Sequence, residues 1–292
     1  MKNKEAQRVT VYCGTKDRYP FLALLINSLT CQTYPFWDLI IVDDNEQPAN
    51  ISTIPFIAPF LAYMNNAGNR WSVLFGPKKG PHAIHKLAVQ SIKTPLILRV
   101  DDDLVLDKDY ILNLVNAIEK DDSIGAVGGM ILNPSVPLAN QSIKEYPKQE
   151  SFSDKVNFSG KVMEDTNGAP VHSPYLQWFM MKDKTVREVQ HLHCSFMYKR
   201  MAAITSNAWD EEAFDFLTAK GHNEETMGSY AMWLNGYNIL IDPKAFAWHM
   251  YSPVGGIRTD PKADHVKMKE HDDRIFYTWY CEQKKKFPEK FK

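Results

Sequence analysis

The stretch of sequence that decides the fold reads Leu96-Ile97-Leu98-Arg99-Val100-Asp101-Asp102-Asp103-Leu104-Val105-Leu106. A short, mostly apolar run follows Thr94-Pro95 and leads directly into three consecutive aspartates. Such a run is typical of a buried strand in a parallel sheet, where both faces of the strand are covered. Three like charges beyond the carboxyl end of that strand are costly unless a cation neutralises them. The stretch therefore predicts a cation site at the edge of a sheet.

Asp101 and Asp103 are the candidate metal ligands. In extended backbone, side chains two residues apart point the same way, so these two carboxylates can converge on one ion while Asp102 turns away. Oxygen ligands suit magnesium or manganese, and such an ion commonly bridges the phosphates of a nucleotide. A solvated acidic turn that caps the following helix is the alternative, and the neighbouring motifs decide between the two.

The composition of the 292 residues, 44% hydrophobic and 24% charged, is that of a soluble globular protein. A formal net charge of -1 gives no general attraction to nucleic acid or to anionic membranes. The four cysteines form no CxxC pair, which favours free thiols in a reducing compartment. No apolar run reaches membrane-spanning length, and the first ten residues are too polar for a signal peptide, so we expect a cytoplasmic protein.

Strands and helices alternate around the acidic stretch. Strands are expected at 9–13, 38–42, 71–75 and 124–129, and helices at 20–29, 82–92 and 109–119. Residues 51–66 contain two prolines and are expected to be broken helix or loop. This order is typical of an α/β fold with a mainly parallel sheet, in which ligands bind beyond the carboxyl ends of the strands.

The second half of the chain has a weaker pattern. Residues 133–184 are expected to cover a cleft as loops and short strands. Strands are predicted at 188–198, 238–241 and 245–249. A helix is expected to end before Gly236, and a final helix to span about 263–285, after a mobile loop at 253–258.

The order of five motifs resembles the family-two glycosyltransferases of the GT-A fold. The motifs are a first strand that leads into a polar turn, Ile40-Ile41-Val42-Asp43-Asp44, Val100-Asp101-Asp102-Asp103, Glu224-Glu225, and a late strand that ends in His249. The resemblance spans roughly residues 9–249. It implies a single Rossmann-like α/β domain, in which residues 1–130 bind a nucleotide sugar, residues 131–252 supply the acceptor side and the catalytic base, and residues 253–292 form a mobile loop and a C-terminal helix.

The resemblance implies a nucleotide site at the strand ends of the first half. Asp43 and Asp44 match a pair of family aspartates, one of which meets the nucleobase. The family's helix of glycine and basic residues is matched by Gly80 to Lys86, although the usual arginine is absent and His85 and Lys86 stand in its place. The predicted nucleotide-binding residues are Thr15, Asp43, Asp44, Lys79, His85, Lys86, Asp101, Asp102 and Arg258, the last of these in a loop that could close on the pyrophosphate.

The resemblance also implies a metal centre and a base. Asp101, Asp103 and His249 would bind one Mn²⁺ or Mg²⁺, and the imidazole favours manganese slightly. Glu225, with Glu224 as the second choice, matches the acid that takes the proton of the acceptor hydroxyl in inverting members. The family usually has Glu-Asp here, so the extra methylene moves the carboxylate by roughly one ångström. The alternative is a pair of acids that favours a helix N-terminus.

The reaction implied by the resemblance is metal-dependent transfer of a sugar from a nucleoside diphosphate sugar, with UDP sugars favoured, to an acceptor hydroxyl with inversion. Tyr175 and Trp178 are candidate acceptor-binding residues, because their rings could stack on a sugar, although core packing explains them equally well. The acceptor is left open: a glycan, a protein, a small molecule or a modified nucleobase. A nucleotidyltransferase that makes a nucleotide sugar and a non-catalytic sugar-nucleotide-binding protein are the alternative functions.

Overall fold

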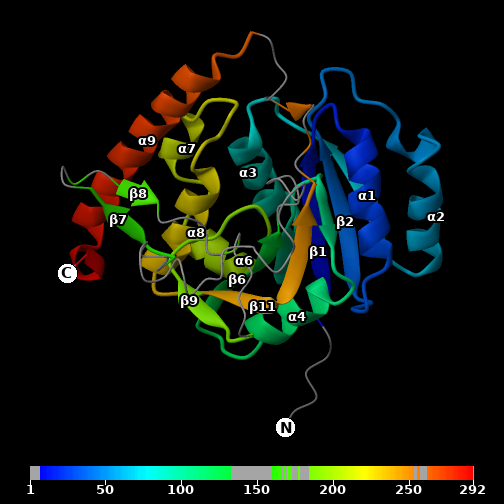
Figure 1. Ribbon diagram of the computed structural model, residues 1–292, viewed down its shortest axis with the longest axis horizontal. Coiled ribbons are helices and arrows are strands. Elements are labelled where there is room, and N and C mark those ends of the chain that lie inside the picture. The colour runs from blue at the N-terminus through cyan, green and yellow to red at the C-terminus, as the bar shows by residue number, and fades with distance from the viewer. Residues whose placement is uncertain are drawn as a thin grey trace, which may run out of the picture.

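The structure, a computed structural model, describes residues 7–132, 160–165, 168, 170–172, 177, 184–250, 252, 255–256 and 262–291. Within these ranges the strands assemble into one nine-stranded sheet and one two-stranded hairpin. Helices cover both faces of the large sheet and form a hydrophobic core on each face (Figure 1). The expected α/β fold, a mixed sheet flanked by helices, is confirmed.

The large sheet has the strand order β3-β2-β1-β4-β10-β6-β11-β5, and β9 also pairs with β11. β3, β2, β1 and β4 are parallel neighbours, as are β6 and β11, whereas β10, β5 and β9 run antiparallel to their partners. Most strands therefore share one direction, and their carboxyl ends meet at one edge of the sheet. The strands are β1 (Val9–Thr15), β2 (Trp37–Asp43), β3 (Trp71–Phe75), β4 (Leu96–Arg99), β5 (Leu104–Leu106), β6 (Ile124–Leu132), β9 (Arg187–Val189), β10 (Phe196–Lys199) and β11 (Asn238–His249).

The helices divide between the two faces of the sheet. The core on one face contains α1 (Tyr19–Thr30), α2 (Ala58–Asn66) and α4 (Tyr110–Ile118). The core on the other contains α3 (Pro81–Ser91), α6 (Arg200–Thr205), α7 (Glu212–Asp215), α8 (Glu224–Leu234) and α9 (His265–Lys286). The described residues also include the short 3₁₀ helices η1 (Ile51–Thr53) and η5 (Pro288–Phe291). The hairpin β7 (Val162–Glu164) and β8 (Pro170–His172) lies beside α9, where Tyr280 donates to Glu164 at 3.1 Å.

The first strand and helix show how the sequence specifies these elements. β1 is almost completely buried, as an interior parallel strand should be. In α1 the buried positions Leu22, Leu25, Ile26 and Leu29 follow the spacing of one helix face, which packs on the sheet. Pro20 stands in the first turn, where its missing N–H has no intrahelical acceptor to lose. The predicted helix at 20–29 is confirmed.

The acidic stretch forms a turn and does not continue the strand. β4 ends at Arg99, and Asp101 to Asp103 connect it to β5, which pairs antiparallel with β11 so that Leu104 lies opposite His249. The extended backbone expected at Asp101 and Asp103 is therefore corrected to a turn. The physical reason is that a sheet ladder offers three adjacent carboxylates no partners, whereas the turn gives each of them a different neighbour.

The predicted strand at 188–198 is wrong as a single element. β9 pairs with β11, whereas β10 pairs with β4 and β6, so residues 190–195 must cross between two parts of the sheet. Cys194 has a φ of 56° in this crossing. The two strands predicted at 238–241 and 245–249 are instead one strand, β11, with an irregularity between Asp242 and Phe246. The broken helix expected at 51–66 is confirmed as η1 and α2.

Both halves of the chain contribute strands to the same sheet, because β10 lies between β4 and β6. The division into a nucleotide-sugar half and an acceptor half therefore concerns function and stays a prediction. Among the residues described, every helix is too short or too polar to cross a bilayer. The cytoplasmic location also stays a prediction.

Candidate functional site

A cavity of about 690 Å³ lies at the carboxyl ends of β1, β4 and β11. Its size is that of a small-molecule or cofactor site. The lining residues come from the turns after these strands, from the first turn of α3 and from the segment that leads into α8. They include Thr15, Asp44, His85, Asp101, Asp102, Asp103, Glu224, Glu225 and His249, all of them predicted site residues.

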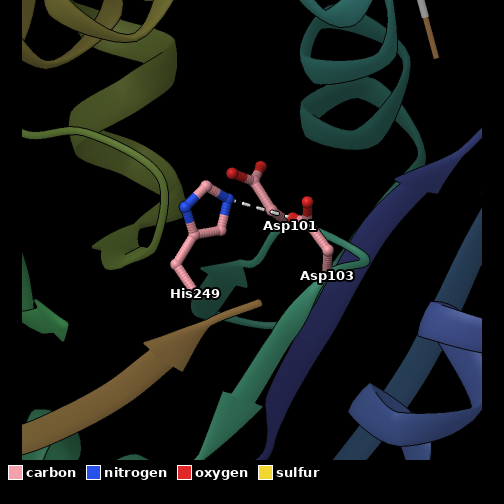
Figure 2. Close-up of side chains that lie close together, drawn as sticks. All are labelled: Asp101, Asp103 and His249. Atoms are coloured by element: carbon pink, nitrogen blue, oxygen red, sulfur yellow. Dashed lines mark hydrogen bonds and ion pairs between the residues drawn. The ribbon is translucent and has the colours of Figure 1, made fainter. Parts of the chain in front are cut away.

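Three predicted metal ligands point toward one another in this cavity (Figure 2). Asp101, Asp103 and His249 each offer one ligand atom, and these atoms all lie within 4.8 Å of one another. His249 Nε2 is 3.1 Å from Asp103 Oδ1. Burial acts to raise the pKa of Asp103, but hydrogen bonding and charge from His249, together with the charge of Arg18, lower it below its usual range. Two carboxylates and an imidazole form a donor set that fits Mn²⁺ or Mg²⁺.

Asp102 turns away from this group and contacts the β1–α1 turn. Thr15 Oγ1 donates to Asp102 Oδ2 at 2.8 Å, and Arg18 Nη1 lies 3.1 Å from Asp102 Oδ1. Burial raises the pKa of Asp102 to about 7, although Arg18 acts in the opposite direction. Arg18 also donates to the carbonyl oxygen of Gly255 at 3.3 Å. The sequence analysis did not single out Arg18; its position in the polar turn after the first strand is the signal that could have identified it.

The two aspartates that end β2 have different surroundings. Asp44 lines the cavity, and its Oδ1 accepts a hydrogen bond from the backbone N–H of Lys78 at 2.7 Å. Asp43 is buried and accepts hydrogen bonds from the Tyr19 hydroxyl at 2.6 Å and from the backbone of Asn45 at 3.0 Å. Asp43 therefore fixes the start of α1 to the end of β2, whereas Asp44 faces the cavity.

The basic residues in and before α3 also differ in whether they line the cavity. His85 lines the cavity, and burial lowers its pKa to about 3, so the imidazole is neutral at physiological pH. Lys86 points elsewhere and pairs with Asp210 at 3.3 Å. Lys79 is exposed and does not line the cavity, although its neighbour Lys78 does.

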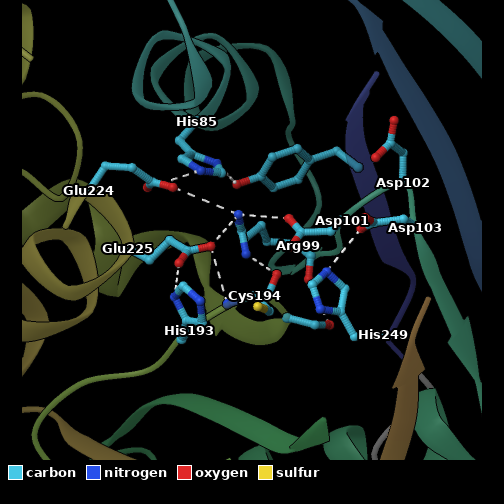
Figure 3. Close-up of polar contacts among 12 residues, drawn as sticks. His85, Arg99, Asp101, Asp102, Asp103, His193, Cys194, Glu224, Glu225 and His249 are labelled. Carbon is cyan, nitrogen blue, oxygen red and sulfur yellow. Dashed lines mark hydrogen bonds and ion pairs between the residues drawn. The ribbon is translucent and has the colours of Figure 1, made fainter. Parts of the chain in front are cut away.

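Glu224 and Glu225 begin α8 and lie on the opposite side of the cavity from Asp102 (Figure 3). The guanidinium of Arg99 lies between the metal-side aspartates and these glutamates. Arg99 Nη2 is 2.9 Å from Asp101 Oδ1 and 3.7 Å from Glu224 Oε1, and it also pairs with Glu225 Oε1. Burial acts to lower the pKa of Arg99, but the surrounding carboxylates raise it well above its usual value, so the guanidinium stays charged.

The two glutamates differ in acidity although they are adjacent. Burial acts to raise the pKa of Glu225, but the charges of Arg99 and His193 and a hydrogen bond from His193 lower it below its usual range. The Cys194 N–H also donates to Glu225 Oε1 at 3.1 Å. Burial and the charge of Glu225 raise the pKa of Glu224 well above its usual value. The pair is thus one ionised carboxylate beside one that holds a proton readily.

Glu224 contacts His85, and His85 in turn contacts Tyr12, which is buried in the core. His85 Nε2 is 3.1 Å from Glu224 Oε2, and His85 Nδ1 is 2.7 Å from the Tyr12 hydroxyl. Burial raises the pKa of Tyr12 well above its usual value, so the hydroxyl keeps its proton and donates it to His85. His85 Nε2 and Glu224 Oε2 lie close together, but neither atom has a hydrogen-bond partner among the described residues. A neutral imidazole thus lies beside the more basic of the two glutamates.

Sequence reasoning missed Arg99 and His193. Arg99 is only 4% exposed, and a charged residue inside an otherwise apolar strand is the signal that could have identified it. His193 lies in the crossing between β9 and β10, which the sequence pattern merged into one strand. Three predicted residues, Tyr175, Trp178 and Arg258, lie outside the described residues.

Comparisons with known proteins agree with this architecture. The family model described as "Glycosyl transferase family 2" matches residues 10–197. A structure of GalNAc-T7 with UDP, GalNAc and Mn²⁺ has a TM-score of 0.63 at 14% identity, over 95% of this chain and 50% of that chain. The mannosyltransferase PcManGT from Pyrobaculum calidifontis, in complex with GDP-Man and Mn²⁺, has a TM-score of 0.53 at 13% identity, over 87% of this chain and 59% of that chain.

The S. aureus protein TarS has a TM-score of 0.54 at 14% identity, over 84% of this chain and 37% of that chain. The chain therefore spans between about a third and three fifths of the length of these structures. At such identities the likeness shows a common fold. A comparison with curated protein sequences finds no match.

Proposed function

The chain belongs to glycosyltransferase family 2, and on that premise we propose that it transfers a sugar from a nucleoside diphosphate sugar to an acceptor hydroxyl, with metal dependence and with inversion. The observation that carries the proposal is the arrangement of three groups around one cavity. All of them line this cavity: Asp44 follows β2, the triad of Asp101, Asp103 and His249 stands at the ends of β4 and β11, and Glu224 and Glu225 begin α8. This arrangement suits a nucleobase, a diphosphate and a reacting acceptor.

Asp101, Asp103 and His249 would hold Mn²⁺ or Mg²⁺. When bound, the ion would supply positive charge that stabilises the negative charge gained by the leaving diphosphate. The Mn²⁺ in the GalNAc-T7 and PcManGT structures supports this assignment. The uridine and guanosine diphosphate groups in the same two structures are donor classes to test, and UDP sugars are the first choice.

The chain's own residues would act on the acceptor. Its hydroxyl oxygen would form a bond to the anomeric carbon as the bond from that carbon to the diphosphate oxygen breaks, and the hydroxyl proton would pass to a carboxylate. Glu225 is ionised at rest because Arg99 and His193 contact it, and the same contacts weaken it as a base by lowering its pKa, so the acceptor must take over part of them before the proton moves. Glu225 as the base, with Glu224 second, stays a prediction from the sequence and is part of this proposal.

The proposal is tested by supplying the protein with Mn²⁺ and a panel of nucleotide sugars. We expect slow hydrolysis of one donor, released as nucleoside diphosphate, and faster release when a suitable acceptor is present. Release of inorganic pyrophosphate would instead indicate a nucleotidyltransferase, and donor binding with neither hydrolysis nor transfer would indicate a binding protein. Either outcome would overturn the proposed reaction.

A further inference from the structure

The segment 218–223 leads from α7 to the two glutamates of α8, and its backbone turns through two residues of positive φ. Ala219 to Asn223 line the cavity, and Glu224 and Glu225 follow directly. Gly221 has a φ of 59° and Asn223 a φ of 74°, so two of its six residues lie in the left-handed region. Glycine adopts this conformation freely, whereas a left-handed asparagine directly before Glu224 costs free energy that contacts with the rest of the chain must offset.

The contacts come from Asp272, in the first half of the C-terminal helix α9. Asp272 Oδ1 accepts the backbone N–H of Thr218 at 2.8 Å, and Oδ2 accepts the Thr218 hydroxyl at 2.9 Å and the backbone N–H of His222 at 2.8 Å. The side chain thus joins both ends of the segment. Asp272 is completely buried and does not line the cavity, so it contacts the segment from behind.

Neighbouring residues of α9 strengthen this attachment. Asp273 Oδ1 accepts a hydrogen bond from Asn223 Nδ2 at 3.0 Å, immediately before Glu224. Lys220 Nζ donates to the carbonyl oxygen of His265 at 3.1 Å, at the first turn of α9. Figure 1 shows α9 beside α7, along the side of the molecule that faces away from α1 and α2. A helix some forty residues later in the chain therefore positions the segment that carries the base.

On this geometry, and resting on the proposed function, we propose that Asp272 is a positioning residue for catalysis. It fixes the 218–223 segment, and through it the carboxylates of Glu224 and Glu225, relative to the metal-side aspartates. The role needs a carboxylate, because three donors converge on two acceptor oxygens. An asparagine has the same shape but one acceptor oxygen, so its NH₂ group would face the N–H of either Thr218 or His222.

The test compares Asp272→Asn with Glu270→Gln, which removes a charge at an exposed position of the same helix. We expect Asp272→Asn to lower kcat at least 10-fold, with the KM for the donor and the Mn²⁺ requirement changed less than about 3-fold, because a shift of about 1 Å at the base costs catalysis and leaves binding intact. Amide hydrogen exchange of residues 216–225 should accelerate about 10-fold in Asp272→Asn alone, while the rest of the chain keeps its protection.

A second variant, Thr218→Val, removes one of the three hydrogen bonds to Asp272, together with the bond from the Lys220 N–H to the Thr218 hydroxyl at 3.3 Å, and leaves α9 unchanged, so it serves if Asp272→Asn does not fold. It should show the same pattern with smaller changes. The inference is overturned if the variants match Glu270→Gln in both kcat and exchange, or if the donor KM rises as much as kcat falls. Hydrogen exchange needs no turnover, so a protein that transfers no sugar would overturn the proposed function while the exchange data still decide whether Asp272 holds the segment.

Discussion

At the scale of single residues, the site depends on how one guanidinium is shared among three carboxylates. Arg99 contacts Asp101, a candidate metal ligand, and both Glu224 and Glu225, and it is almost fully buried. Taking one member from such a buried group leaves a charge without compensation, which is more costly than the group itself. Substitutions here should therefore affect catalysis and stability together, and each needs a control elsewhere.

Asp103 should be required for turnover and not for folding. We expect Asp103→Ala to lower Mn²⁺-dependent activity at least ~100-fold, because the variant loses charge stabilisation of the leaving group. The Asp122→Ala variant, at an exposed position near Lys199, is the matched control and should keep full activity. Initial rates and circular dichroism spectra of both proteins check the prediction. Undiminished metal-dependent activity in Asp103→Ala would rule out the assigned metal site.

The two glutamates should differ in their importance. Glu225→Gln is expected to lower kcat ~100-fold or more, since it removes the carboxylate that is ionised at rest. Glu224→Gln should lower kcat only ~10-fold, because Glu224 already holds a proton readily and glutamine preserves its hydrogen-bonding shape. Single-turnover rates with saturating donor measure both values. The reverse order of the two losses would assign the base to Glu224.

His85 should make the stability of the protein depend on pH. Its pKa is about 3 in the folded chain and about 6.5 when unfolded, so the unfolded chain binds more protons between these values. Stability is therefore complete above about pH 6.5 and falls as the pH decreases, by up to about 1.4 kcal/mol per pH unit from this residue. Urea unfolding at about pH 7, 6 and 5 should show a smaller decrease for His85→Gln than for the unmodified protein. Equal decreases would contradict the prediction.

At the scale of secondary-structure elements, the N-terminus of α3 must fit against the segment 218–223. Gly80 precedes the helix with a φ of 107°, and a Cβ atom there would lie 2.7 Å from the carbonyl oxygen of Ala219. Only glycine tolerates both the backbone conformation and the contact. The two cavity-lining segments therefore meet at a residue without a side chain.

The effect of Gly80→Ala on the cavity should consequently exceed the effect of the unfavourable backbone conformation alone. Gly68, at the end of α2, also has a positive φ, of 81°, but a Cβ there meets nothing within 4 Å. Gly68→Ala measures the conformational cost, of about 1–3 kcal/mol, and Gly80→Ala should exceed it and also lower activity. Thermal unfolding and kcat of the two variants provide the comparison. Similar effects from both would show that the contact with Ala219 is relieved without consequence.

Helices and strands could be predicted from the sequence where the pattern of apolar residues that specifies them is local. The buried face of α1 and the apolar runs of β1 and β2 specify structure over a few residues, and these predictions were confirmed. The break between β9 and β10 could not be foreseen, because it depends on which strands they pair with. The turn at Asp101 to Asp103 was the alternative and not the first prediction, for a related reason: its shape is set by partners such as Thr15 and His249, which are remote in sequence.

At the scale of the whole molecule, the candidate metal site joins the first and second halves of the chain. Asp103 and His249 are 146 residues apart in sequence, and the antiparallel pairing of β5 with β11 brings them together. The ordered motifs of the family allowed the sequence to indicate this triad. The partners of Glu225 were not indicated, because Arg99 and His193 belong to no motif and meet the glutamate only through the sheet order.

A ligand set of this kind exists only in the folded chain, so Mn²⁺ should stabilise the protein. At a concentration of 100 times its Kd, the ion would add about 2.7 kcal/mol, and Tm should rise with the logarithm of the Mn²⁺ concentration. His249→Ala should abolish most of this rise, whereas His271→Ala, on α9, should retain it. Thermal scans across a Mn²⁺ titration measure the effect. An unchanged rise in His249→Ala would place the ion elsewhere.

The position of β10 between β4 and β6 determines which fragments and chimaeras of this protein, made by gene recombination, can fold. A fragment that ended near residue 130 would lack the strand that fills the gap between β4 and β6, and both strands would present unsatisfied backbone edges that invite aggregation. Residues 1–130 are thus not a transplantable module. Chimaeras with other members of the family should fold only when both crossover points lie outside the sheet, so that all strands derive from one parent.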